Sequence, residues 1–166
     1  TPAQRKVYEA VVEAQQAGID AARPGVPMHA IHDAAVAVIA RKLDEWGLLP
    51  VSADESLTPE GGQHRRWMVH GTSHHLGLDV HDCAQARSEN FREGILAEGM
   101  VVTVEPGLYF KSTDLLVPEE LRGIGVRIED DIAITADGCV VLSDQLPKDP
   151  DAVEAWIAGI WAGPAA

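Results

Sequence analysis

Apolar residues recur at helical spacing near the start of the chain. Thr1, Pro2 and Gln4 stand where an N-cap, a first-turn proline and a capping-box partner belong, which predicts a helix from the first residues to about Ala22. Its buried face is expected to comprise Val7, Val11, Ala14, Ile19 and Ala22. Gly18 falls on the same face and indicates either a close packing contact or a weak last turn.

Two further stretches have helical periodicity. A second helix is predicted from about Met28 to Trp46, where Gly47 can stop it. Its apolar side comprises Ile31, Ala34, Ala35, Val38, Ile39, Leu43 and Trp46. A last helix is predicted from about Asp151 to Trp161, with an inner side made of Val153, Trp156, Ile157 and Ile160.

Short β-type segments and loops lie between these helices. Residues 100–104 are rich in β-branched side chains, and Pro106-Gly107 predicts a bend soon after them. Residues 126–135 alternate, so the apolar residues face one way and Arg127, Glu129 and Asp131 the other. Asp137-Gly138 predicts a hairpin turn before a strand at 139–142. Loops are expected at residues 49–63, 86–91 and 111–125.

Length, charge and cysteine usage narrow the class of protein. A chain of 166 residues is long enough for one domain with a core. Its net charge of -13 argues against a nucleic-acid or anionic-membrane partner, because Arg65-Arg66 is the only basic cluster. No apolar run approaches the roughly 20 residues that span a bilayer. Cys83 and Cys139 suit structural roles in a reducing compartment, so we expect a cytoplasmic protein.

The most chemically dense stretch of the chain is residues 70–82. It contains four histidines, at positions 70, 74, 75 and 81, together with two glycines and two aspartates. His70 and His74 have the spacing of the H-E-x-x-H zinc motif, but Gly71 occupies the glutamate position, which argues against that class. Glycines in the stretch favour an extended or turning backbone, so the histidines need partners from elsewhere. His75 receives no functional role.

Two glutamates can supply the carboxylates that such histidines need. Glu105 closes an apolar strand, and Pro106-Gly107 follows it directly. Glu129 shares a strand face with Arg127, and the opposite face must be core. One imidazole with carboxylates suits Mn, Co, Fe or Zn, and these ligand types do not select one metal.

Three motifs resemble one enzyme family. They are MVHGTSHHLGLDVHD at 68–82, TVEPGLY at 103–109 and GIGVRIEDDI at 123–132, and together they resemble the catalytic half of the pita-bread metallopeptidases. Within that family, LSDQLPK at 142–148 and the following helix resemble aminopeptidase P more than prolidase or methionine aminopeptidase. The resemblance implies an α+β pita-bread fold with an antiparallel sheet covered by helices. It also implies removal of the N-terminal residue from peptides with proline second.

The resemblance implies a metal-binding role for three residues. His74 and Glu105 correspond to ligands of one ion, and Glu129 corresponds to the glutamate that bridges two ions. Manganese is the first expectation, with cobalt or zinc as alternatives.

The resemblance also implies roles around the metals. His70 and His81 correspond to histidines that hold the substrate and stabilise developing negative charge. Tyr109 and Arg127 correspond to a pair that orients ligands and relays protons, and Glu105 is also the family's candidate general base.

One departure from the family pattern affects the expected activity. The family has two further aspartate ligands on strands that precede the helix beginning here at Thr1, and no aspartate of this chain fits them. Residues 1–166 therefore resemble the C-terminal portion of a catalytic domain, expected to be inactive alone. Its uncovered surfaces are expected to need the N-terminal half or a second copy. Two alternatives stay open, a prolidase and a non-catalytic pita-bread module that binds peptides.

Overall fold

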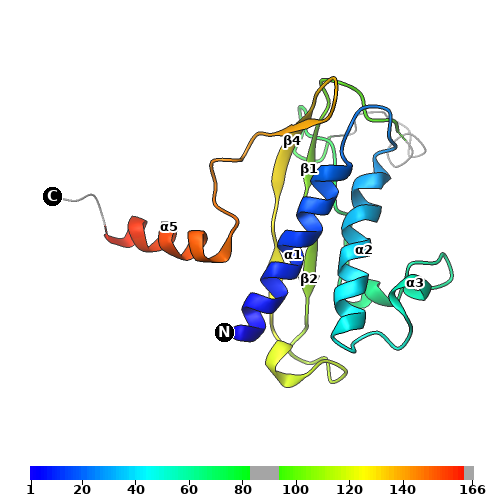
Figure 1. The fold of residues 1–166 in the computed structure, drawn as a ribbon, viewed down its shortest axis with the longest axis vertical. Helices are drawn as coiled ribbons and strands as arrows, with labels where there is room; N and C mark the ends of the chain where they lie inside the picture. The colour runs from blue at the N-terminus through cyan, green and yellow to red at the C-terminus, as the bar shows by residue number, and fades with distance from the viewer. Residues whose placement is uncertain (83–93, 163–166) are drawn as a thin grey trace.

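The computed structural model describes residues 1–82 and 94–162 of the chain. Helices α1 (Pro2–Ala21) and α2 (His29–Glu45) pack side by side and cover one face of the strands (Figure 1). Antiparallel strands covered by helices are the predicted α+β architecture. The loop predicted at 86–91, and Cys83, lie outside the described residues.

The described strands form two small antiparallel sheets. One sheet has the order β1 (Val101–Val104), β4 (Asp130–Ile134) and β5 (Cys139–Val141), and the other pairs β2 (Gly107–Tyr109) with β3 (Gly125–Arg127). Val104 pairs with Asp130 in the first sheet, and Gly107 pairs with Arg127 in the second. Both pairings have the same register. If this register is continued through the residues between the two sheets, Glu105 lies opposite Glu129 and Pro106 lies opposite Ile128.

Two predictions about these strands are wrong. The strand predicted at 126–135 is interrupted at Ile128 and Glu129, and the predicted bend at Pro106-Gly107 gives way to strand β2, which begins at Gly107. Pro106 accounts for both differences. Its carbonyl accepts from the N–H of Ile128 at 3.4 Å. It has no N–H with which to return the bond, so the ladder breaks at this level.

The predicted face of the first helix is confirmed, and on the second helix five of the seven expected residues are buried, with Ala34 and Trp46 partly buried. Thr1 and Gln4 form the capping box, and all five residues expected on the first helix face are buried. Gly18 is in close contact with its neighbours, since a Cβ there would lie 2.9 Å from Val104 and 3.3 Å from the Ile31 side chain. Gly18 therefore allows α1 to approach β1 and α2 at one point.

Three short helices lie within the predicted loops or begin at the end of one. They are α3 (Ala53–Ser56), η1 (Gln63–Arg66) and η2 (Glu119–Leu121), and each has about one turn, too few residues to show periodicity in the sequence. Asp114 connects the loop at residues 111–125 to η1 and the residue after it. Its carboxylate accepts hydrogen bonds from Arg66 Nε at 2.9 Å and from Trp67 Nε1 at 3.2 Å. The hydrogen bond from Arg66 holds the pKa of Asp114 well below its usual range. Both contacts fix the chain just before the histidine stretch.

The prediction for the last helix is half right. Helix α5 (Pro150–Ala162) is present, but the expected inner residues Trp156, Ile157 and Ile160 are 50%, 43% and 59% exposed. Figure 1 shows α5 projecting from the body of the fold. It is held near α1 by Arg5, which pairs with Asp151 at 2.6 Å. None of the described helices is both long enough and apolar enough to cross a bilayer.

The close contact at Gly18 gives a stability prediction. Gly18→Val should lower the free energy of unfolding by about 1–3 kcal/mol, because the added methyls overpack the junction of α1, β1 and α2. Gly159→Val is the matched control, since a Cβ at Gly159 meets nothing within 4 Å. It should change the same quantity by less than about 0.5 kcal/mol in urea denaturation. Equal effects of the two substitutions would contradict the packing argument.

Candidate metal centre

Three potential ligands converge in the structure. One ligand atom each from His74, Glu105 and Glu129 lies within 4.8 Å of the others, and His74 Nε2 is 3.1 Å from Glu105 Oε1. These are the residues for which the resemblance implied metal binding. They come from three separate parts of the chain, so the fold itself brings them together.

The two glutamates occupy the gap between the sheets. Glu105 directly follows β1, and Glu129 stands between β3 and β4. The shared register places them opposite each other on the same side of the two strands. Glu105 is 8% exposed, whereas Glu129 is exposed. The site therefore opens to solvent on the Glu129 side.

His74 is placed by a segment that runs antiparallel to β1. The N–H of Thr103 donates to the carbonyl of His74 at 2.9 Å, and the N–H of Glu105 donates to the carbonyl of Thr72 at 2.7 Å. Leu76 continues the pairing by donating to Val101 at 3.0 Å. Residues 72–76 are thus fixed to the strand that ends at Glu105.

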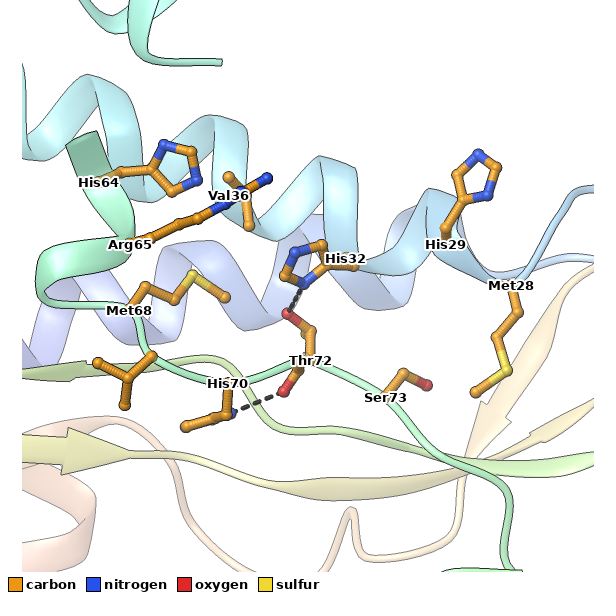
Figure 2. Close-up of a pocket in the computed structure, with 12 residues that line it drawn as sticks. Met28, His29, His32, Val36, His64, Arg65, Met68, His70, Thr72 and Ser73 are labelled. Carbon is orange, nitrogen blue, oxygen red and sulfur yellow. Dashed lines mark hydrogen bonds between the residues drawn. The ribbon is translucent and has the colours of Figure 1, made fainter. Parts of the chain in front are cut away.

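The opposite side of this segment faces helix α2. A groove between α2 and residues 64–73 is lined by residues that include Met28, His32, His64 and Met68 (Figure 2). Within it, His32 Nδ1 lies 2.9 Å from the hydroxyl of Thr72. This bond fastens the segment to α2.

The hydrogen bonds of His74 leave one nitrogen available as a ligand. Its Nδ1 lies 3.1 Å from the carbonyl of His75, which can only accept, so the neutral ring carries its proton on Nδ1. Nε2 then presents a lone pair toward Glu105. Two electron-rich atoms at this distance suit a cation between them. The donor set of one imidazole and two carboxylates fits a divalent metal ion.

Burial and charge shift two pKa values at the site. Partial burial raises the pKa of Glu129, the Glu105 carboxylate raises it further, and Arg127 opposes both. Burial also raises the pKa of Tyr109, against the opposing effect of Arg127. Tyr109 therefore keeps its phenolic proton at neutral pH.

Among the other predicted site residues, His81 and Arg127 each contact a ligand residue, and His70 contacts Tyr109. The rings of His74 and His81 meet edge to face with centroids 4.4 Å apart, and Arg127 Nη1 lies 3.5 Å from Glu105 Oε2. His70 Nε2 lies 2.7 Å from the Tyr109 hydroxyl. His70 Nδ1 faces the carbonyl of Gly71 at 2.7 Å, so the neutral ring accepts a hydrogen bond from Tyr109.

Sequence reasoning missed one buried carboxylate beside the site. Asp130 is 2% exposed, accepts from the Ser143 hydroxyl at 2.6 Å and forms an ion pair with Lys148. It follows Glu129 directly and pairs with Val104. The signal was available, because the alternation of 126–135 puts Asp130 on the core side between Ile128 and Ile132.

A second missed residue is Thr103. Its hydroxyl lies between the two predicted ligands His74 and Glu105, at 3.1 Å from the backbone nitrogen of His74. Nothing in a strand sequence distinguishes this threonine from one chosen for its β propensity.

Comparisons with known proteins show the family of the chain. The family model described as metallopeptidase family M24 matches residues 1–136. Xaa-Pro aminopeptidase 1 of Streptomyces coelicolor is 56% identical over 157 residues, which are 95% of this chain and 32% of that protein. The chain thus spans about a third of the length of the curated relatives that it matches.

Solved structures have the same fold. Aminopeptidase PepP of Pseudomonas aeruginosa superposes with a TM-score of 0.89 and 38% identity, over 98% of this chain and 36% of that one. Aminopeptidase P of Escherichia coli, solved with the inhibitor Pro-Leu, gives 0.86 and 40% over 96% of this chain and 35% of that one. The predicted pita-bread fold is confirmed by these likenesses. The chain belongs to metallopeptidase family M24.

Proposed function

We propose that the protein carrying this chain is a metal-dependent aminopeptidase that removes the N-terminal residue from peptides with proline in the second position. The observation that carries this proposal is the convergence of His74, Glu105 and Glu129 within 4.8 Å. The named relatives support the substrate class, since they include Xaa-Pro aminopeptidases at 56% and 41% identity.

The proposed metal centre uses the three converging residues. His74 and Glu105 would hold one divalent cation, and Glu129 would be a ligand of this cation and of a second one. Manganese is our first choice, and cobalt or zinc would suit the same donors. The remaining ligands of the second cation are proposed to be aspartates from outside these 166 residues. A pair of bound divalent cations would polarise the peptide carbonyl and lower the pKa of water toward about 7.

The surrounding residues are proposed to move protons and hold the substrate. Glu105 accepts a proton from the attacking water and passes it to the proline nitrogen as the peptide bond breaks. Arg127 holds the carboxylate of Glu105 in orientation. His81 and His70 bind the substrate beside the ligands and stabilise the negative charge that develops on the carbonyl oxygen. Tyr109 orients His70 through their 2.7 Å hydrogen bond.

The exposed apolar face of α5 is proposed to pack against the rest of the same polypeptide. Trp156, Ile157 and Ile160 are too exposed to contribute to a core of the described residues. The chain spans only about a third of the length of these relatives, so they contain further polypeptide that could cover this helix. The cytoplasmic location stays a prediction.

Peptide hydrolysis tests the proposed function. The full-length protein, loaded with Mn²⁺, should release the first residue from a tripeptide with proline second, and chelation should abolish this. A tripeptide with alanine second is the control and should be cleaved much more slowly. The 166-residue chain alone should bind at most one ion and release nothing. Cleavage restricted to Xaa-Pro dipeptides would identify a prolidase, and peptide binding without cleavage would identify a binding module.

Light scattering tests the proposed covering of α5. The isolated 166-residue chain should self-associate as its concentration rises, because the apolar face of α5 is open to solvent. Trp156→Glu should reduce that association, whereas Glu154→Gln on the same helix should not. A chain that stays monomeric at high concentration would contradict the proposal.

A further inference from the structure

We propose that Thr103 is a positioning residue that aligns two ligands of the metal centre through a single hydroxyl group. The inference rests on the proposed metal site, and it assigns to Thr103 a role beyond that of an ordinary strand residue. Thr103 lies in β1 and is 1% exposed. Its side chain is on the same strand face as Glu105, two residues later.

The hydroxyl of Thr103 contacts both ligand residues. It accepts a hydrogen bond from the backbone N–H of His74 at 3.1 Å. It donates to Oε1 of Glu105 at 3.4 Å. In a regular antiparallel pair, the N–H of His74 would donate to the backbone carbonyl of Thr103. Here the Thr103 hydroxyl accepts this hydrogen bond instead.

The direction of both bonds follows from the chemistry of the groups. The N–H of His74 can only donate, which engages a lone pair of the Thr103 oxygen. The one hydroxyl proton is then available for the carboxylate. Oε1 is also the oxygen that faces His74 Nε2 at 3.1 Å. Thr103 thereby holds the oxygen that the proposed cation would need.

The second oxygen of Glu105 is held independently. Arg127 Nη1 lies 3.5 Å from Oε2, so the two oxygens are contacted from different strands. With Thr103 on one oxygen and Arg127 on the other, the rotation of the carboxylate is restricted. A hydroxyl that merely satisfied a backbone group would not contact a ligand oxygen. Contact with two ligands at once is what assigns a positioning role.

The experiment compares four variants of the full-length protein by calorimetric titration with Mn²⁺. Thr103→Val keeps the shape of the side chain but removes the hydroxyl, and it should weaken Mn²⁺ binding by about 10–100-fold. Thr103→Ser restores the hydroxyl and should stay within about threefold of the original affinity. Ser56→Ala removes a buried hydroxyl that contacts His64 and neither ligand side chain, so it should also stay within about threefold.

Circular dichroism confirms that each variant is folded before titration, and Glu105→Gln serves as a reference that removes a ligand. Loss of Mn²⁺ affinity in Thr103→Val, with recovery in Thr103→Ser, supports the proposal. If Glu105→Gln weakens binding and Thr103→Val does not, the metal site stands and the role of Thr103 is overturned. If neither substitution changes binding, the proposed metal site is wrong and the inference falls with it. Equal losses in Thr103→Val and Ser56→Ala would show a general packing effect and also overturn the inference.

Discussion

Two carboxylates held opposite each other repel, and the fold places Glu105 and Glu129 in that arrangement. Partial burial raises the pKa of Glu129, and the repulsion from Glu105 raises it further. Pro106 breaks the ladder one residue further along, so neither glutamate is confined within a continuous sheet. A cation bound between the glutamates and His74 would turn the repulsion into attraction. The arrangement that makes the two carboxylates repel is therefore the same arrangement that would bind the metal.

The rest of the structure keeps these groups in place. Helix α1 packs closely on β1 at Gly18, next to Val104, the residue before Glu105. On the other strand, Asp130 is buried beside Glu129 and neutralised by Lys148 from the C-terminal segment. Residues 72–76 carry His74 and are bonded both to β1 and, through Thr72, to α2. The backbone that carries each ligand is thus held by packing, by an ion pair or by hydrogen bonds.

The sequence predicted the elements whose pattern is long and local. The apolar faces of α1 and α2 followed from periodicity, and the capping residues at Thr1 and Gln4 located the first turn. The break between β3 and β4 could not be predicted in this way, because it depends on Pro106, which lies between the partner strands β1 and β2. The face of α5 was misjudged for a related reason. Periodicity shows that a helix has an apolar side but not what covers it.

Recognition of the candidate site depended on motifs, and its geometry depended on the fold. His74, Glu105 and Glu129 could be singled out from three short motifs, but only the register of the strands brings them within 4.8 Å. Anomalous X-ray diffraction at the zinc edge, from crystals of the full-length protein grown with Zn²⁺, tests this convergence most directly. We expect a peak about 2.0–2.2 Å from His74 Nε2 and from one oxygen of each glutamate. A peak elsewhere, or His74 and Glu105 coordinating nothing in common, would contradict the account.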